Sequence, residues 1–204
     1  MGYHWIPFAV AAYFLGSVPF GKLIAKKVAR IDITRTGSGN IGATNVAREI
    51  GLKWGLLTLT LDVLKGFLPV IFLAHYTPQS THGQEVALSF VGLSALLGHQ
   101  FSLFETFRGG KGVATALGIY LAISPVSCLL ALLVFVSVVY KWNFVSLGSI
   151  TSACAMPLIL ALFKTPQTFV ITSLAVGTLI CIKHKDNILR ILRGQETGWR
   201  DRHT

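Results

Sequence analysis

Residues 54–76 read WGLLTLTLDVLKGFLPVIFLAHY, an apolar run interrupted by one acid and one base. A helix crosses the hydrocarbon core of a bilayer with about 20 apolar residues, so this run is long enough to span a membrane. The composition of the 204-residue chain agrees, because 52% of its residues are hydrophobic and only 13% are charged. A soluble domain usually carries about 25% charged residues. The sequence therefore predicts an all-α integral membrane protein.

Six further apolar runs complete a predicted bundle of seven transmembrane helices. The predicted spans are Trp5 to Ile24, Trp54 to Tyr76, Val86 to Phe104, Gly112 to Ser124, Val126 to Tyr140, Phe144 to Phe163 and Thr168 to Ile182. The fourth and fifth runs are short and only Pro125 separates them, so their length also allows one proline-kinked helix. Seven spans leave no room for a soluble domain, and we expect a single transmembrane domain over residues 1–204.

The distribution of positive charge favours seven spans over six and sets the orientation. The chain carries 18 Lys and Arg against 8 Asp and Glu. With seven spans, every Lys and Arg except Lys65 and Lys164 falls on one side of the membrane, whereas six spans leave little bias. Because cytoplasmic loops are enriched in Lys and Arg, we expect the N-terminus outside and the C-terminus in the cytoplasm. In so apolar a chain, basic loops indicate a membrane surface and no nucleic-acid partner.

Glycine-rich polar segments gather in the connections predicted on the cytoplasmic side. The first is Ser38-Gly39-Asn40-Ile41-Gly42-Ala43-Thr44-Asn45-Val46-Ala47-Arg48, and the second contains Gly109-Gly110-Lys111-Gly112-Val113-Ala114-Thr115. Glycines let backbone N–H groups converge on an anion. Arg48 can bind a phosphate through two hydrogen bonds, and Lys111 supplies a point charge. Hydroxyl and amide groups for the remaining oxygens come from Ser38, Asn40, Asn45, Thr115 and Ser149. Together these segments predict a site for phosphate-containing ligands.

Several of these residues have structural alternatives. Glycines also let membrane helices pack closely, and Arg48 and Lys111 could be topology charges alone. Asp62 and Lys65 lie three residues apart on one helical face within a predicted span, where each alone would cost roughly 2.5–3.5 kcal/mol. They could form a structural ion pair or a wall of the site. His184 and Asn187 are expected on one face of a continuing helix.

Other chemistries lack their motifs in this sequence. No DxxxD pair, HExxH or CxxC spacing is present, so the sequence predicts no metal site and no cofactor. The His-x4-Asp arrangement of a large class of acyltransferases is also missing, because Phe104 follows His99 and Leu189 follows His184 at that spacing. Any acyl transfer here would proceed without that protein base.

The motifs as a set resemble the bacterial acyl-phosphate-dependent glycerol-3-phosphate acyltransferase family. The resemblance rests on Ser38-Gly-Asn-x-Gly-Ala-x-Asn-x-x-Arg48, Gly98-His-x-Phe with Gly109-Gly-Lys-Gly-Val-Ala-Thr115, Ser146-x-x-Ser149 and His184-x-x-Asn187. It covers nearly the whole chain. One departure is Lys141-Trp142-Asn143-Phe144, where an arginine and a tyrosine are common in the family.

The resemblance implies a multi-pass enzyme of the bacterial inner membrane with a cytoplasmic active site. Its substrates would be glycerol 3-phosphate and long-chain acyl phosphate, its product lysophosphatidic acid, and no obligatory protein partner is implied. Residues implied to bind glycerol 3-phosphate are Ser38, Arg48, Lys111, His184 and Asn187. The acyl phosphate headgroup would be held by the first motif and by Gly109, Gly110 and Gly112. Arg48, Lys111 and Ser149 are the predicted catalytic residues, and the other predicted contacts are Gly39, Asn40, Gly42, Asn45, Thr115 and Ser146.

Two functions other than an enzyme fit some of the same features. A transporter of a phosphorylated metabolite would also use glycine loops and cations, but it needs polar groups at both faces of the membrane. A scaffold for anionic lipid would use the basic tail, in which residues 188–193 resemble an interfacial amphipathic helix. The scaffold leaves the first two glycine motifs unexplained.

Overall fold

The computed structural model describes residues 4–77 and 81–201, and within these the chain forms helices and no strand. Its helices fall into two compact units, Met1–Ile123 and Ser124–Thr204, which we call the first and second units. The first contains α1 (Ile6–Ser17), α2 (Phe20–Ala29), η1 (Ile33–Arg35), α3 (Ala43–Ile50), α4 (Leu52–Tyr76), α5 (His82–Gln100), η2 (Leu103–Glu105) and α6 (Val113–Ile123). The second contains α7 (Pro125–Trp142), α8 (Val145–Leu162), α9 (Gln167–Lys183) and α10 (Lys185–Leu192). Whether residues 1–204 form the single predicted domain stays a prediction.

The prediction of an all-helical membrane protein is confirmed at the level of apolar helices. Among the described residues, five helices are long and apolar enough to cross a membrane, or six if the bent pair α9 and α10 forms one span. Large apolar side chains such as Leu133, Leu158 and Leu162 are 60–79% exposed, as expected of helices that face lipid. The seven-span count and the orientation stay predictions, and Arg202, one of the tail cations, lies outside the described residues.

The first predicted span is a broken helix. α1 ends at Ser17 and α2 begins at Phe20, with Val18 in an extended conformation between them. Pro19 has no N–H group and cannot continue the α1 hydrogen-bond ladder. The fourth and fifth predicted runs form separate helices, because Ser124 has φ −149° and ψ 82° between α6 and α7.

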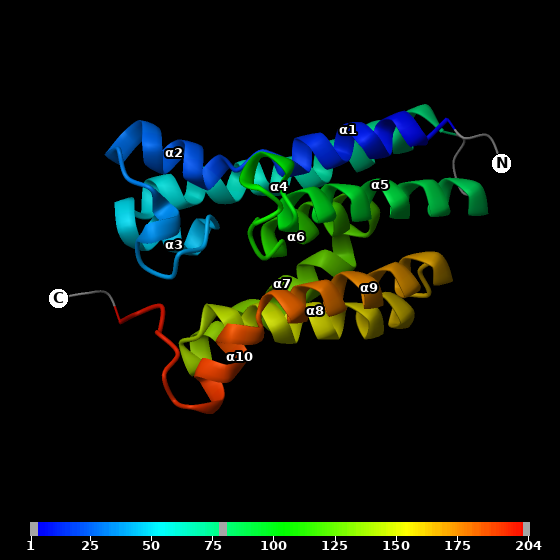
Figure 1. Cartoon of the computed structure of the whole chain (residues 1–204). Helices are drawn as coiled ribbons and strands as arrows, with labels where there is room; N and C mark the ends of the chain where they lie inside the picture. The colour runs from blue at the N-terminus through cyan, green and yellow to red at the C-terminus, as the bar shows by residue number, and fades with distance from the viewer. Residues whose placement is uncertain (1–3, 78–80, 202–204) are drawn as a thin grey trace. The chain divides into compact units, whose positions relative to one another are not determined.

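Within the first unit, α1 packs along α5 and α4 packs along α6 (Figure 1). Two glycines allow the backbones of α1 and α5 to touch. A Cβ at Gly16 would clash with the carbonyl oxygen of Ala95, and a Cβ at Gly98 would clash with that of Tyr13. Small residues at crossing points permit this close approach of membrane helices.

In the second unit, α8 packs against both α7 and α9. Asn143 ends α7 in the left-handed conformation, at φ 63°. The carboxyl-terminal tail returns to this turn, where Trp199 N donates to Asn143 O (2.7 Å) and Arg200 N donates to Asn143 Oδ1 (2.9 Å). The tail therefore covers the connection between α7 and α8.

Candidate active site

The first glycine motif folds into a loop that one buried side chain holds together. Asn45, 2% exposed at the start of α3, accepts a hydrogen bond from Ser38 N (2.9 Å). Its Nδ2 lies within hydrogen-bond distance of three carbonyl oxygens, those of Asn40 (2.9 Å), Thr36 (3.1 Å) and Ile33 (3.2 Å). The Asn45 amide thus shapes the loop from inside, and its predicted contact with substrate stays a prediction.

The remaining residues of this motif take different positions around the loop. Asn40 Oδ1 accepts from Gly42 N (2.8 Å), and Gly39 adopts φ 69°, which favours glycine. Ser38 and Gly39 are exposed, whereas Arg48 is half-buried in the last turn of α3. The loop rests on a buried apolar cluster of Ala25, Ile33, Ile41 and Val46. This support fixes its backbone independently of any ligand.

The second glycine motif lies against the last turn of α5. Gly109 N donates to Gln100 O (3.2 Å), and Gly110 N donates to His99 O (3.0 Å). The Gln100 side chain, fully buried, donates from Nε2 to Lys111 O (2.9 Å). Gly109 and Gly110 leave no room for a side chain, since a Cβ would clash with His99 O and His99 Nε2 respectively. The loop backbone is therefore fixed immediately before Lys111.

The second motif continues directly into α6. Gly112 adopts φ 86°, and Ala116 N donates to Gly112 O (2.8 Å) at the start of the helix. Thr115 is fully buried, and a Cβ at Gly66 of α4 would clash with its carbonyl oxygen. Thr115 thus lies where α4 and α6 pack, and its predicted contact with substrate stays a prediction.

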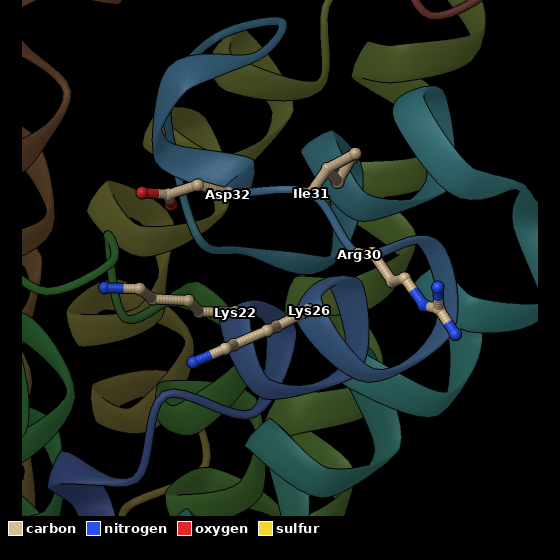
Figure 2. A pocket seen from close by; sticks show the side chains of 5 residues that line it. All are labelled: Lys22, Lys26, Arg30, Ile31 and Asp32. Carbon is tan, nitrogen blue, oxygen red and sulfur yellow. The ribbon is translucent and has the colours of Figure 1, made fainter.

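The first unit also contains a basic pocket of about 260 Å³. Lys22, Lys26, Arg30, Ile31 and Asp32 line it, and Figure 2 shows the two lysines pointing to the same side of α2 while Arg30 points away. A hydrogen bond from the Thr34 side chain holds the pKa of the Asp32 carboxyl below its ordinary value. Lys22 also forms an ion pair with Glu105 (2.5 Å). Sequence reasoning did not single out this pocket.

Two predicted residues of the second unit, Ser146 and Asn187, bind a carboxylate that sequence reasoning missed. Glu196 Oε1 accepts hydrogen bonds from Ser146 Oγ (2.5 Å) and Asn187 Nδ2 (2.7 Å), and Arg190 Nε donates to Oε2 (2.9 Å). The Ser149 hydroxyl donates to Val145 O one turn earlier (2.8 Å). No local motif marks Glu196, since its partner Ser146 is 50 residues away in sequence.

The continuing helix predicted at His184 is wrong. α9 ends at Lys183 and α10 begins at Lys185, and the two are bent by 62°. The His184 ring lies 2.8 Å from Ile180 O through Nδ1, and the His184 backbone N–H also donates to that carbonyl (3.0 Å). The histidine thereby ends one helix and begins the next, and Asn187 follows in the first turn of α10.

Glu196 predicts a pH dependence for the stability of the second unit. Partial burial by itself would raise the pKa of this carboxyl, but hydrogen bonds from Ser146, Asn187 and Arg190 outweigh burial and hold it below its ordinary value. A pKa lowered by folding stabilises the protein fully above the unfolded-state value, and this stabilisation is lost as pH falls through the folded-state value. We expect Glu196→Gln to flatten the fall of the thermal midpoint on acidification. An unchanged slope would contradict the lowered pKa.

The comparisons with known proteins agree with one another. The family model for glycerol-3-phosphate acyltransferase matches residues 6–194. A glycerol-3-phosphate acyltransferase of Geotalea daltonii is 46% identical over 187 residues, which cover 92% of this chain and 93% of that protein. The crystal structure of PlsY (YgiH), an integral membrane glycerol 3-phosphate acyltransferase, in its glycerol 3-phosphate form is similar with a TM-score of 0.89 at 38% identity, covering 96% of this chain and 95% of the other. Its lysophosphatidic acid form gives 0.87 at 38% identity over the same shares.

Proposed function

Because this chain belongs to the glycerol-3-phosphate acyltransferase family, we propose that it transfers a fatty acyl group from acyl phosphate to the 1-hydroxyl of sn-glycerol 3-phosphate. The products are lysophosphatidic acid and inorganic phosphate. The observation that carries this proposal is the family match across residues 6–194. We place the enzyme in the bacterial inner membrane, with seven spans, its N-terminus outside and its site on the cytoplasmic face, as the distribution of Lys and Arg favours.

The two glycine motifs of the first unit supply the groups that phosphate-bearing substrates require. In this proposal Arg48 and Ser38 bind glycerol 3-phosphate, and Lys111 neutralises charge on the phosphate groups. The Gly109–Gly112 loop and the first motif hold the acyl phosphate headgroup. The N–H groups of Gly109 and Gly110 donate to α5 and fix the loop, so the donors to the headgroup are other N–H groups of these two segments. The fixed backbone of the second loop supports this role, because a preorganised donor needs no rearrangement during the reaction.

Four predicted residues lie in the second unit. In this proposal, His184, Asn187 and Ser146 contact substrate, and Ser149 lies near the reacting groups. The hydrogen bonds of Ser146 and Asn187 to Glu196 support a fixed orientation of both side chains. These assignments follow from the family motifs, and a single substitution at each residue can test them.

The proposed reaction needs little help from a protein base. The 1-hydroxyl oxygen attacks the acyl carbon, the bond from that carbon to the phosphate oxygen breaks, and inorganic phosphate leaves. The hydroxyl proton passes to a substrate phosphate oxygen. Acyl phosphate is already activated, and holding the two substrates together supplies a large part of the rate. The absence of a His-x4-Asp arrangement motivates this mechanism.

A donor comparison tests the proposed function. Purified protein is given glycerol 3-phosphate with palmitoyl phosphate, palmitoyl-CoA or palmitoyl-acyl carrier protein, and formation of lysophosphatidic acid is measured. We expect product with palmitoyl phosphate alone, together with one equivalent of inorganic phosphate. Transfer from either thioester, or none from palmitoyl phosphate, would contradict the assigned donor.

His184 gives a separate test of the mechanism. If a substrate phosphate takes the proton, we expect His184→Ala to weaken glycerol 3-phosphate binding. The shape of the pH profile of kcat near neutrality should stay the same as in the original protein. The measurement is kcat and KM between pH 5.5 and 9 for both proteins. Loss of a titrating limb together with loss of kcat at unchanged binding would show that His184 is the base.

A further inference from the structure

A buried ion pair lies at the middle of α4. Lys65 Nζ is 2.7 Å from Asp62 Oδ1, and the two side chains are 1% and 4% exposed. Lys65 Nζ also donates to Val18 O (3.0 Å) and lies 5.6 Å from the ring centre of Phe20. Val18 O also accepts from Phe20 N (3.1 Å), so the lysine is a second donor to a carbonyl oxygen at the break between α1 and α2.

His99 connects this pair to the second glycine motif. Its Nδ1 lies 3.7 Å from Asp62 Oδ1, longer than an ordinary hydrogen bond, and the pair is ionic only when the imidazole is protonated. The opposite side of the ring meets Gly110, where an added Cβ would clash with Nε2. The imidazole thus fills the space between the α4 carboxylate and the glycine loop, and it is 4% exposed.

The backbone of the same residue carries the loop. His99 O accepts from Gly110 N (3.0 Å), and the neighbouring Gln100 binds both Gly109 N and Lys111 O. The Gly110 backbone therefore meets His99 twice, at its carbonyl oxygen and at its ring, directly before Lys111. Neither Asp62 nor Lys65 is exposed enough to meet a substrate from solution, so any effect they have on the reaction is transmitted.

We propose that Asp62 and Lys65, acting through His99, are positioning residues that fix the Gly109–Lys111 loop for the reaction. This inference rests on the proposed function, in which Lys111 contacts phosphate. A buried ion pair is often no more stabilising than apolar residues of similar volume, so overall stability is a poor explanation for this pair. Its contacts with the helix break and with His99 indicate a role in geometry.

The test uses a paired variant that removes both charges while keeping volume, Asp62→Leu with Lys65→Met, in the purified full-length protein. We expect the thermal midpoint to change by a few degrees only. Amide hydrogen exchange in residues 109–113 should rise at least tenfold, and KM for glycerol 3-phosphate should rise about tenfold or more. A second paired variant, Asp62→Asn with Lys65→Met, keeps an oxygen toward His99 without leaving a buried lysine charge unpaired, and its exchange should stay within about threefold of the original protein.

Ser89→Ala provides a matched control on α5. Ser89 is buried, and its hydroxyl has no hydrogen-bond partner among the described residues, so its removal leaves the loop intact. We expect unchanged exchange and unchanged kinetics for this variant. Equal effects from Ser89→Ala would mean that any buried polar substitution loosens the loop, and this would overturn the proposal.

The exchange measurement needs no activity, so it separates this inference from the proposed function. Unchanged exchange in residues 109–113 of the paired variant overturns the positioning role even if the enzyme works as proposed. Faster exchange with no acyl transfer by the original protein supports the positioning role and contradicts the proposed function. If the activity of the paired variant falls only as much as its folded fraction falls, the inference is also overturned.

Discussion

Lys111→Ala is expected to lower kcat/KM for glycerol 3-phosphate by about 10²–10³-fold, the usual cost of removing one charge-stabilising group from an active site. Lys111 carries the only positive charge between Gly109 and Thr115. Its backbone carbonyl accepts a hydrogen bond from the buried Gln100 side chain, so the position of its Cα is fixed. Steady-state formation of lysophosphatidic acid by purified protein in detergent measures the loss.

Lys164→Ala is the matched control for Lys111. Lys164 is an exposed lysine that follows α8 and belongs to neither glycine motif. Its removal should leave kcat/KM within about twofold of the original value. Turnover close to normal in Lys111→Ala would show that its charge sets topology alone, and Arg48→Ala would then become the decisive variant for phosphate contact.

Gly109→Ala is expected to reduce kcat/KM by about 100-fold, since a displacement of about 1 Å at a reacting group can cost that much. The added methyl would collide with the carbonyl oxygen of His99, which is backbone and cannot rotate away. The loop must therefore leave α5 and lose the bonds of Gly109 N and Gly110 N. Kinetics and thermal midpoint measured together separate a displaced loop from an unfolded protein.

Gly194→Asn is the control for a glycine substitution at a turn. Gly194 adopts φ 66°, a conformation that asparagine tolerates, and among the described residues no atom beyond its chain neighbours lies within 4 Å of an added Cβ. We expect this variant to retain full activity. If Gly109→Ala is equally active, the backbone of residue 109 does not need to lie this close to His99 O, and the described loop geometry is wrong.

Much of the helical organisation could be predicted from hydropathy. The predicted span Trp54 to Tyr76 corresponds to α4 (Leu52–Tyr76), and Phe144 to Phe163 corresponds to α8 (Val145–Leu162). The break before Phe20 was not predicted, because hydropathy averaged over a long window does not change when only two residues are non-helical. The bend at His184 was missed for a similar reason, since a side-chain bond to Ile180 O has no sequence periodicity.

In the candidate site too, features that depend on neighbouring residues could be predicted, and contacts between distant segments could not. Glycines, cations and amides that act within one motif were visible, because their chemistry depends on near neighbours in sequence. The roles of Gln100 and Glu196 were not, since they hold partners from other segments. Asn45 shows the intermediate case: its type was recognised, but its four contacts turn inward to the loop and not outward.

The glycine crossing of α1 and α5 also constrains how the chain is assembled. Gly16 emerges early in synthesis, whereas its partner backbone at Ala95 follows about eighty residues later. The close crossing of α1 and α5 can therefore form only after the chain has been synthesised beyond Gly98, whereas α1 can already pack against α4.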